Sequence, residues 1–381
     1  MKFYSRRLNL ADHLKKKSHF LFGPRSTGKS SLIKNQLPEA LVFDLLDRAV
    51  FNELLKNPSI LRERIKGKKQ VVVIDEIQKL PSLLDEVHRL IFEKEIKFLL
   101  TGSSARKLKR GGVNLLGGRA WEAQLFPLSF IEIEDFNLIR YLNRGGLPHI
   151  YQSSHAGEEL RSYVHLYLQE EIHAEALTRN LEAFTRFLDV VAISNGEEIS
   201  YVNLANDSGI QAKTIQNYTQ ILFDTLLAYS LKPFLATKKR KAITREKIYL
   251  FDLGVVNQLA NRGEIKNKSE LFGKAFEHFL MNEVRAYLSY HRIPETMHYW
   301  RSTSQFEVDL VVGTKLAVEF KATDSVDERH LRGLKALQEE GLVKRFIVVS
   351  QDRNARKHAS GIEILPWSEF LNRLWAGTLI R

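Results

Sequence analysis

Cysteine is absent from the 381 residues of the sequence. A chain without thiols has no disulfide framework, no cysteine-ligated zinc or iron–sulfur site and no thiol nucleophile, and it suits a reducing compartment. The sequence also lacks any stretch approaching the roughly 18 consecutive apolar residues of a membrane-spanning helix, and its first residues lack the apolar core of a signal peptide. We therefore expect a cytoplasmic protein with no membrane partner.

Acidic residues are the scarcer charged class. The 45 Asp and Glu residues stand against 57 Lys and Arg residues, which gives a net charge of +12. Such an excess favours polyanionic partners, namely nucleotides, nucleic acids or anionic surfaces. Hydrophobic residues make up 44% and charged residues 27%, a composition that supports packed cores and excludes wholesale disorder. At about 150 residues per domain, the length predicts roughly two to three domains.

A glycine-rich motif follows a short apolar run near the N-terminus. Residues 19–22 predict a strand, residues from Leu32 onward predict a helix, and the segment between them reads G-x-x-x-x-G-K-S. In this motif the glycines let backbone amides cradle phosphate oxygens, the lysine reaches the β- and γ-phosphates, and the serine completes a Mg²⁺ shell. The sequence therefore predicts a site for ATP and Mg²⁺ formed by Gly23, Pro24, Arg25, Ser26, Thr27, Gly28, Lys29, Ser30 and Ser31.

A second element consists of four aliphatic residues, 71–74, that end in Asp75 and Glu76. A continuous β-branched run predicts a strand buried on both faces of a parallel sheet, and ligands bind at the carboxyl ends of such strands. We expect Asp75 to hold Mg²⁺ and Glu76 to polarise the attacking water, which predicts an ATPase. The alternative is a nucleotide-gated switch that binds ATP tightly and rarely turns it over.

Two further positions are candidates for contact with the γ-phosphate. Residues 96–104 predict another buried strand that ends in hydroxyl side chains, of which Ser103, and less specifically Ser104, could sense the phosphate or the lytic water; strand-end hydroxyls also act as caps. Arg119 follows a glycine pair. It is either an arginine finger donated to a neighbouring subunit of a homo-oligomer or a surface charge.

Four segments together carry a family resemblance. GPRSTGKS, VVVIDEIQKLP, LLTGSS and GGRAWEAQLFPLSF resemble the prokaryotic AAA+ family ATPases that carry a C-terminal nuclease-like domain of unknown function, and the resemblance runs through the whole chain. It departs at Ser26-Thr27, where family members often have Gln-Val. The resemblance implies an AAA+ core over residues 1–135, a helical lid over 136–182, and packing of Pro148 on adenine. A plain loop-to-helix entry is the alternative for that proline.

Residues 183–255 predict a winged helix. Two helical stretches, 203–208 and 212–226, flank a turn at Gly209 with the spacing of a helix-turn-helix. The basic run 238–241 between two apolar stretches predicts the tip of a β-wing. DNA is the expected partner, and the alternative is a packing module or a protein-binding role. The side chains that would face a major groove are Lys213, Thr214, Gln216 and Asn217.

Residues 262–381 predict a small α/β domain of the restriction-endonuclease type. Asp309 lies on one predicted strand, and Glu319 and Lys321 lie two apart on the next, which is the D…ExK arrangement of PD-(D/E)xK nucleases, with Val308 in place of the motif's proline. The two carboxylates would bind Mg²⁺, and Lys321 would orient or deprotonate the attacking water. Glu277, on a preceding predicted helix, matches the additional acidic position of the nuclease family.

The length of one hairpin loop decides whether these residues share a face. A two-residue loop, 313–314, would place Glu319 on the face opposite Asp309. A three-residue loop, 313–315, pairs Val312 with Leu316 and sets Asp309 across from Glu319. An assembled site therefore requires the three-residue register or a bulge.

The sequence as a whole predicts an α/β protein: a P-loop AAA+ parallel sheet with a helical lid, then a winged helix, then a small restriction-endonuclease-like domain. We expect an ATPase that acts on DNA. The alternative is a nucleotide-gated switch or scaffold that binds a protein partner and has a catalytically inactive C-terminal domain.

Overall fold

The computed structural model describes residues 3–67, 70–103, 106, 108, 116–168 and 180–380. The chain divides into two compact units. The N-terminal unit comprises Lys2–Leu128 and Ile221–Leu227, and the C-terminal unit comprises Ser129–Gln220 and Ala228–Arg381. In the part of the chain that the structure describes, no helix combines the length and apolar character needed to cross a bilayer.

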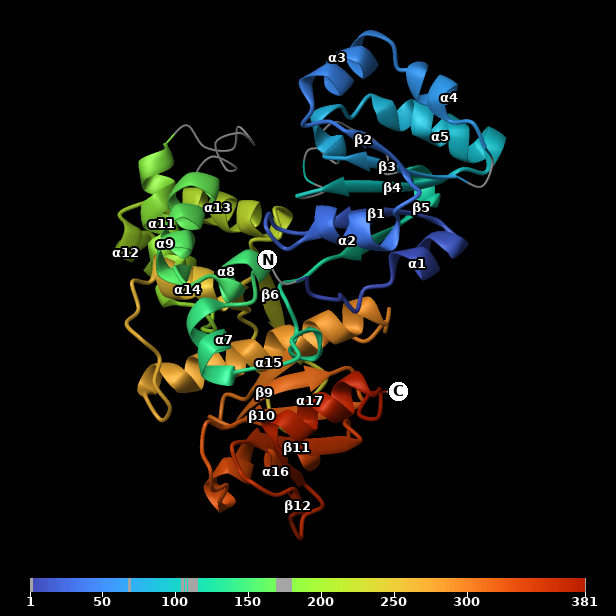
Figure 1. The fold of residues 1–381 in the computed structure, drawn as a ribbon. Helices are drawn as coiled ribbons and strands as arrows, with labels where there is room; N and C mark the ends of the chain where they lie inside the picture. The colour runs from blue at the N-terminus through green and yellow to red at the C-terminus, as the bar shows by residue number, and fades with distance from the viewer. Residues whose placement is uncertain are drawn as a thin grey trace. The chain divides into compact units, whose positions relative to one another are not determined.

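The N-terminal unit is a three-layer α/β structure (Figure 1). Its described strands form a five-stranded sheet in the order β2-β3-β4-β1-β5, and all the pairings are parallel. Helices α1 and α2 lie on one face, and α3, α4 and α5 lie on the other. This confirms the predicted parallel sheet. The bounds are α1 Leu10–Lys16, β1 Ser18–Phe22, α2 Lys29–Gln36, β2 Leu41–Asp44, α3 Arg48–Lys56, α4 Ile60–Arg64, β3 Val71–Asp75, α5 Leu83–Lys94, β4 Lys97–Gly102 and β5 Ala120–Gln124.

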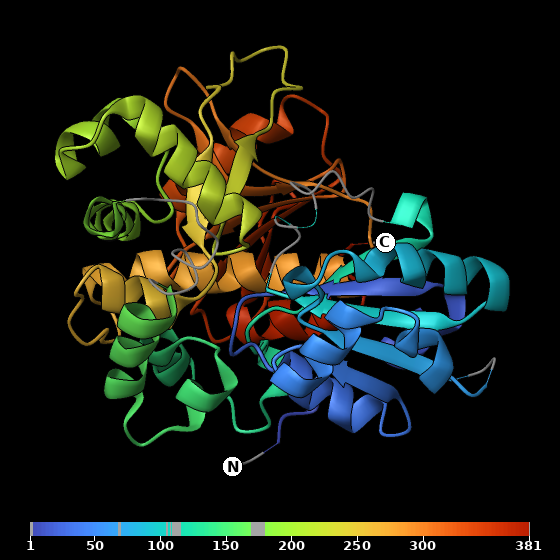
Figure 2. The ribbon, with the colours of Figure 1, turned by 90° about the horizontal axis from the view of Figure 1, so that it is seen from above.

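Helices make up the first part of the C-terminal unit. Phe184 and Phe187 of α11 pack against Tyr218 of α13, with ring centroids 4.8 and 5.5 Å apart, and Figure 2 shows α11, α12 and α13 together in green to yellow-green. Residues 169–179 of the predicted lid lie outside the described residues, as does Ser104. The bounds are α7 Leu138–Arg144, α8 Pro148–Gln152, α9 Ala156–Ser162, a π-helical turn Tyr163–Leu168, α11 Leu181–Ile193, α12 Tyr201–Ser208, α13 Ala212–Asp224 and α14 Leu253–Leu259. The end of α13, from residue 221 on, is assigned to the N-terminal unit.

The predicted helix-turn-helix stretches are both helical. Ser200 caps α12 at its N-terminus, and Gly209 ends it with φ 68°, the left-handed region that favours glycine. Lys213, Gln216 and Asn217 of α13 are exposed. The winged-helix assignment itself stays a prediction.

The rest of the C-terminal unit surrounds a mixed sheet. Among the described residues it has eight strands in the order β12-β13-β11-β10-β9-β8-β6-β7. Strands β6 and β7, where the sequence predicts the wing, belong to this sheet because β6 pairs in parallel with β8. The bounds are β6 Ala228–Pro233, β7 Lys247–Leu250, α15 Glu270–Tyr290, β8 Met297–Arg301, β9 Glu307–Val312, β10 Leu316–Phe320, α16 Arg332–Gln338, β11 Arg345–Ser350, β12 Arg356–Lys357, β13 Glu363–Pro366 and α17 Trp367–Trp375. Short 3₁₀ turns lie at Ile77–Lys79 and Leu116–Gly118 in the N-terminal unit and at Phe130–Glu132 and Glu328–Leu331 in the C-terminal unit.

Candidate nucleotide and carboxylate sites

The glycine-rich loop connects the end of β1 to the start of α2, as the motif predicts. Gly28 is the N-cap of α2 with φ 97°, a backbone conformation that favours glycine. At Gly23, an added Cβ would lie 2.5 Å from the carbonyl oxygen of Leu125, so this close approach also requires glycine. The Lys29 Nζ donates to the carbonyl oxygens of Gly23 at 2.6 Å and Pro24 at 3.2 Å. The ammonium therefore lies against the loop backbone, where this motif binds phosphate.

The other residues of the predicted phosphate-binding loop differ in how far they are buried. Thr27 is fully buried, and its hydroxyl donates to the carbonyl oxygen of Pro24 at 2.8 Å. Ser26 has φ 62°, and its side chain is exposed, as are those of Ser30 and Ser31, whereas Arg25 is half-buried. A cavity of about 270 Å³ opens beside Ser30 and has apolar walls from α2, β2 and β3.

The predicted Mg²⁺ ligands lie next to one another. The Ser30 Oγ is 3.4 Å from Asp75 Oδ2 at the carboxyl end of β3. Thr101 of β4 donates its hydroxyl to the other oxygen of Asp75 and accepts the backbone N–H of Glu76 at 3.2 Å. One threonine thereby orients both acidic residues. A hydroxyl and a carboxylate are oxygen donors of the kind that Mg²⁺ prefers, so the residues present fit the ion.

Glu76 is held in an unusual environment. Its backbone lies at φ 59°, and its carboxylate accepts a hydrogen bond from the side chain of Gln78. Burial raises the pKa of the Glu76 carboxyl, while the charge of Lys29 opposes this shift. A half-buried carboxylate under the influence of the Lys29 charge is suited to accept a proton from a water molecule.

Thr101, and not Ser103, contacts the acidic pair. Ser103 is buried just beyond β4, and Arg119 lies with its guanidinium 5.9 Å from the ring centroid of Phe92. Pro148 is the first residue of α8, which belongs to the C-terminal unit. The roles of Ser103, Arg119 and Pro148 toward the nucleotide stay predictions.

Arg6 contacts the glycine-rich loop, and sequence reasoning missed it. It is 8% exposed, and its guanidinium donates at 2.6 Å to the carbonyl oxygen of Thr27 in the loop and at 2.6 Å to that of Phe126. A phosphate-binding loop turns its amides inward and some carbonyls outward, and outward carbonyls that are buried need donors. The contacts span 21 and 120 residues of sequence, so no local signal could have identified them.

The C-terminal acidic residues meet because the hairpin has the three-residue loop. Val312 pairs with Leu316 and Leu310 with Val318, and this register places Asp309 of β9 beside Glu319 of β10. The Lys321 Nζ lies 2.6 Å from Glu319 Oε1 and 4.0 Å from Asp309 Oδ2. The structure therefore brings together the D…ExK residues that the sequence predicts on one face.

Glu319 has an incomplete set of hydrogen bonds. The residue is 7% exposed, and its Oε2 atom is buried without a hydrogen-bond partner among the described residues. Burial and the neighbouring Asp309 raise the pKa of Glu319. Burial lowers the pKa of Lys321, but Asp309 and Glu319 outweigh this effect and raise it. A buried carboxylate oxygen with no donor indicates a place for a cation or a proton.

Glu277 of α15 joins this cluster from the helix side. The hydroxyl of Tyr249 donates to Glu277 Oε1 at 2.6 Å, and burial together with the charge of Asp309 raises the pKa of Glu277. Within the described ranges, no three His, Cys, Asp or Glu side chains form a group that could hold a metal ion. A cation there would have Asp309 and Glu319 as its protein ligands and would complete its shell with water and substrate oxygens, as Mg²⁺ commonly does.

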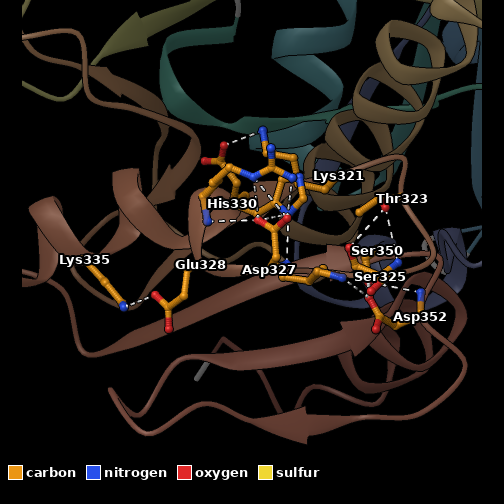
Figure 3. A network of polar contacts seen from close by, with 12 residues as sticks. Lys321, Thr323, Ser325, Asp327, Glu328, His330, Lys335, Ser350 and Asp352 are labelled. Atoms are coloured by element: carbon orange, nitrogen blue, oxygen red, sulfur yellow. Dashed lines mark hydrogen bonds and ion pairs between the residues drawn. The ribbon is translucent and has the colours of Figure 1, made fainter.

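The chain beyond Lys321 is fixed by polar contacts (Figure 3). Asp327 and His330 cap a short 3₁₀ helix through reciprocal side-chain and backbone hydrogen bonds. The hydroxyl of Ser350, at the end of β11, donates to Asp352 at 2.7 Å. These contacts hold the loop at the carboxyl ends of β10 and β11, which is where Lys321 projects.

Three family models match the chain. Residues 15–134 match an AAA domain. Residues 135–266 and 272–370 match two domains of unknown function, DUF8612 and DUF4143. The matches divide the chain near residues 135 and 270, and Arg6 precedes the first of them.

The similar curated proteins have no described activity. The chain is 26% identical over 321 residues to the uncharacterized proteins Rv2008c of Mycobacterium tuberculosis and Mb2031c of Mycobacterium bovis, and each alignment covers 80% of this chain and 70% of the relative. It is 27% identical over 241 residues to the uncharacterized protein MJ1544 of Methanocaldococcus jannaschii, covering 56% of this chain and 52% of that protein.

The AAA match contains the glycine-rich loop, Asp75 and Glu76, all of which stand at the carboxyl edge of the parallel sheet. The DUF4143 match contains Glu277, Asp309, Glu319 and Lys321. Sequence and geometry together support a P-loop AAA-type ATPase domain at residues 15–134, in a chain whose residues 272–370 match a domain of unknown function.

Proposed function

We propose that the N-terminal domain binds ATP with Mg²⁺ and hydrolyses it. The observation that carries this proposal is the 3.4 Å distance between the hydroxyl of Ser30, which directly follows Lys29, and the carboxylate of Asp75 at the end of β3. Ser30 and Asp75 would hold the ion, and Lys29 would bind the β- and γ-phosphates. Bound Mg²⁺ would neutralise the charge that develops on the transferred phosphoryl group.

Glu76 is the general base of the proposed reaction. Its raised pKa makes its carboxylate a better proton acceptor, and Thr101 and Gln78 fix its backbone and side chain. The Glu76→Gln variant should bind ATP and fail to release it as ADP, because the amide does not accept the proton. Lys29→Ala should lose ATP binding. Retained bound ATP is measured by separating the nucleotides after gel filtration.

We propose in addition that the C-terminal domain binds a divalent cation and acts on DNA phosphodiesters. The support is the shared face of Asp309, Glu319 and Lys321 and the unpartnered, buried Oε2 of Glu319. Asp309 and Glu319 would hold the ion, and Lys321 would orient the attacking water. The bound ion would polarise the scissile phosphate.

Two surfaces of the middle segment are the proposed DNA contacts. Lys213, Gln216 and Asn217 form an exposed polar stripe on α13. On the loop between β6 and β7, Arg240 pairs with Glu339 at 2.5 Å, and Lys239 donates to the Glu339 carbonyl at 2.6 Å. Arg240 and Lys239 are therefore engaged within the protein. The exposed Lys238 and Lys241 are the cations of this loop that we assign to DNA phosphate.

DNA cleavage with Mn²⁺, with and without ATP, tests this part of the proposal. Wild-type protein should nick duplex DNA, and Asp309→Ala should not. The specific alternative is a nucleotide-gated switch whose C-terminal domain is inactive, and the 2.6 Å Lys321–Glu319 ion pair favours it because the cluster is partly compensated without a metal. Absence of nicking in both proteins, with DNA binding retained, would establish that the C-terminal domain is catalytically inactive.

A further inference from the structure

Strand β7 lies in the DUF8612 match, yet it contributes to the carboxylate cluster of the DUF4143 match. Lys247 of β7 pairs with Leu231 of β6. In the sheet β6 is next to β8, and β8 is next to β9, the strand that carries Glu307 and Asp309. The first residue of β7 therefore reaches the same side of the C-terminal unit as the acidic residues. Sequence reasoning missed it because Lys247 lies in a predicted wing, 60 residues before its partner Glu307.

Lys247 is a buried cation. Its side chain is 8% exposed, its Nζ lies 2.7 Å from Glu307 Oε1, and it stands 5.1 Å from the ring centroid of Tyr299. Burying an ammonium is unfavourable unless anions compensate it. Burial lowers the pKa of Lys247, but the charges of Glu277, Glu307 and Asp309 outweigh burial and raise it. The ammonium is therefore charged, and it forms an ion pair with Glu307 close to the other carboxylates of the cluster.

Tyr249 faces the same cluster from the same strand. It lies two residues after Lys247, so both side chains point to one face of β7. Its hydroxyl donates to Glu277 at 2.6 Å, and its ring stacks on that of Tyr229 at 5.4 Å. One strand face thus supplies an ammonium and a phenol to the acidic cluster, and both are rigidly placed.

We propose that Lys247 is a built-in counter-cation of the carboxylate site and sets its affinity for a divalent ion. This rests on the metal site proposed above. Glu277, Glu307 and Asp309 concentrate negative charge that a bound metal ion would compensate. The ammonium of Lys247 compensates part of this charge even when no metal ion is bound. It also repels an approaching dication. The middle domain of unknown function therefore completes the site of the C-terminal domain and makes its metal binding weaker than the carboxylates alone would give.

Titration calorimetry of the nucleotide-free, full-length protein with Mn²⁺ tests the proposal, with Asp309→Ala as the reference for ions bound elsewhere. Lys247→Met should tighten Mn²⁺ binding by about tenfold or more, because a unit charge facing a dication at an effective dielectric of about 20 outweighs the roughly 1.4 kcal/mol that a tenfold change represents. Lys247→Arg, which keeps the charge, should bind as wild type does. Lys335→Met is the control. It removes a lysine whose ion-pair partner is Glu328, at 2.5 Å, and it should bind Mn²⁺ as wild type does.

If Lys247 were only structural, its removal would not tighten Mn²⁺ binding. Unchanged or weaker Mn²⁺ affinity in Lys247→Met, with wild-type binding intact, overturns the role of Lys247 and leaves the metal site standing. Identical titrations of wild type and Asp309→Ala overturn the metal site itself. If Lys247→Met does not fold, Glu307→Gln and Lys247→Met/Glu307→Gln are compared, since removing both partners leaves no uncompensated member of the pair. The double variant should then bind Mn²⁺ about tenfold more tightly than Glu307→Gln.

Discussion

Replacing Thr101 by valine should separate ATP binding from ATP hydrolysis. Thr101 is fully buried; its hydroxyl donates to Asp75 and accepts the N–H of Glu76. Valine keeps the shape and removes both hydrogen bonds. Leaving buried partners unsatisfied costs about 1–3 kcal/mol. If this cost falls on the transition state, kcat decreases by about 5- to 150-fold.

The assay is steady-state ATP hydrolysis together with the Kd of a fluorescent ATP analogue. Because the Thr101 hydroxyl bonds to Asp75 and Glu76, whereas Lys29 and the loop amides would bind the phosphates, the Kd of Thr101→Val should stay within about threefold of wild type. Thr101→Ser keeps the hydroxyl and should restore most of kcat. An unchanged kcat in Thr101→Val, or a loss of binding as large as the loss of hydrolysis, would refute the role assigned to this residue.

Three further predictions concern other parts of the molecule. Arg6→Lys should weaken binding of the ATP analogue by about tenfold, because a shorter side chain with one nitrogen does not reproduce the contacts that two guanidinium nitrogens make with the Thr27 and Phe126 carbonyls, whereas the exposed Arg7→Lys should not; equal affinities would contradict the bridge. Burial raises the pKa of Glu283 from 4.5 to about 8. Between pH 4.5 and about 8 the folded state therefore keeps a proton that the unfolded state has released, so the free energy of unfolding should decrease as the pH rises through this range. Glu283→Gln should flatten that part of a Tm-against-pH profile. Lys238→Ala/Lys241→Ala should reduce the salt slope of DNA binding by about 0.9 for each DNA phosphate that the variant no longer neutralises, and a salt-insensitive affinity would favour a protein partner.

Local motifs allowed the nucleotide site to be predicted from the sequence. The strand–loop–helix order around Lys29 and the aliphatic run before Asp75 are contiguous signals, and both predicted strands form there, while helix α2 begins at Lys29, earlier than the predicted start at Leu32. Side-chain alternation limited the hairpin between β9 and β10 to few registers, because an assembled site required the three-residue loop or a bulge. The structure has the three-residue loop.

Contacts between residues far apart in the sequence could not be predicted from it. Arg6, Thr101 and Lys247 act through partners that lie 21 to 120 residues away in the sequence. A lone threonine or lysine in a strand carries no pattern that distinguishes it from its neighbours. The predicted wing likewise gave no sign that β6 would pair with β8, since parallel pairing between segments far apart in the sequence leaves no local signature.

The most direct test is ATP turnover by the full-length protein, measured with and without duplex DNA in wild type and in Lys29→Ala. We expect wild type to hydrolyse ATP at a rate that DNA changes, and Lys29→Ala to show no turnover in either condition. A wild-type rate that is the same with and without DNA would contradict the coupling of the ATPase to DNA. Undiminished hydrolysis by Lys29→Ala would contradict the assignment of the nucleotide site itself.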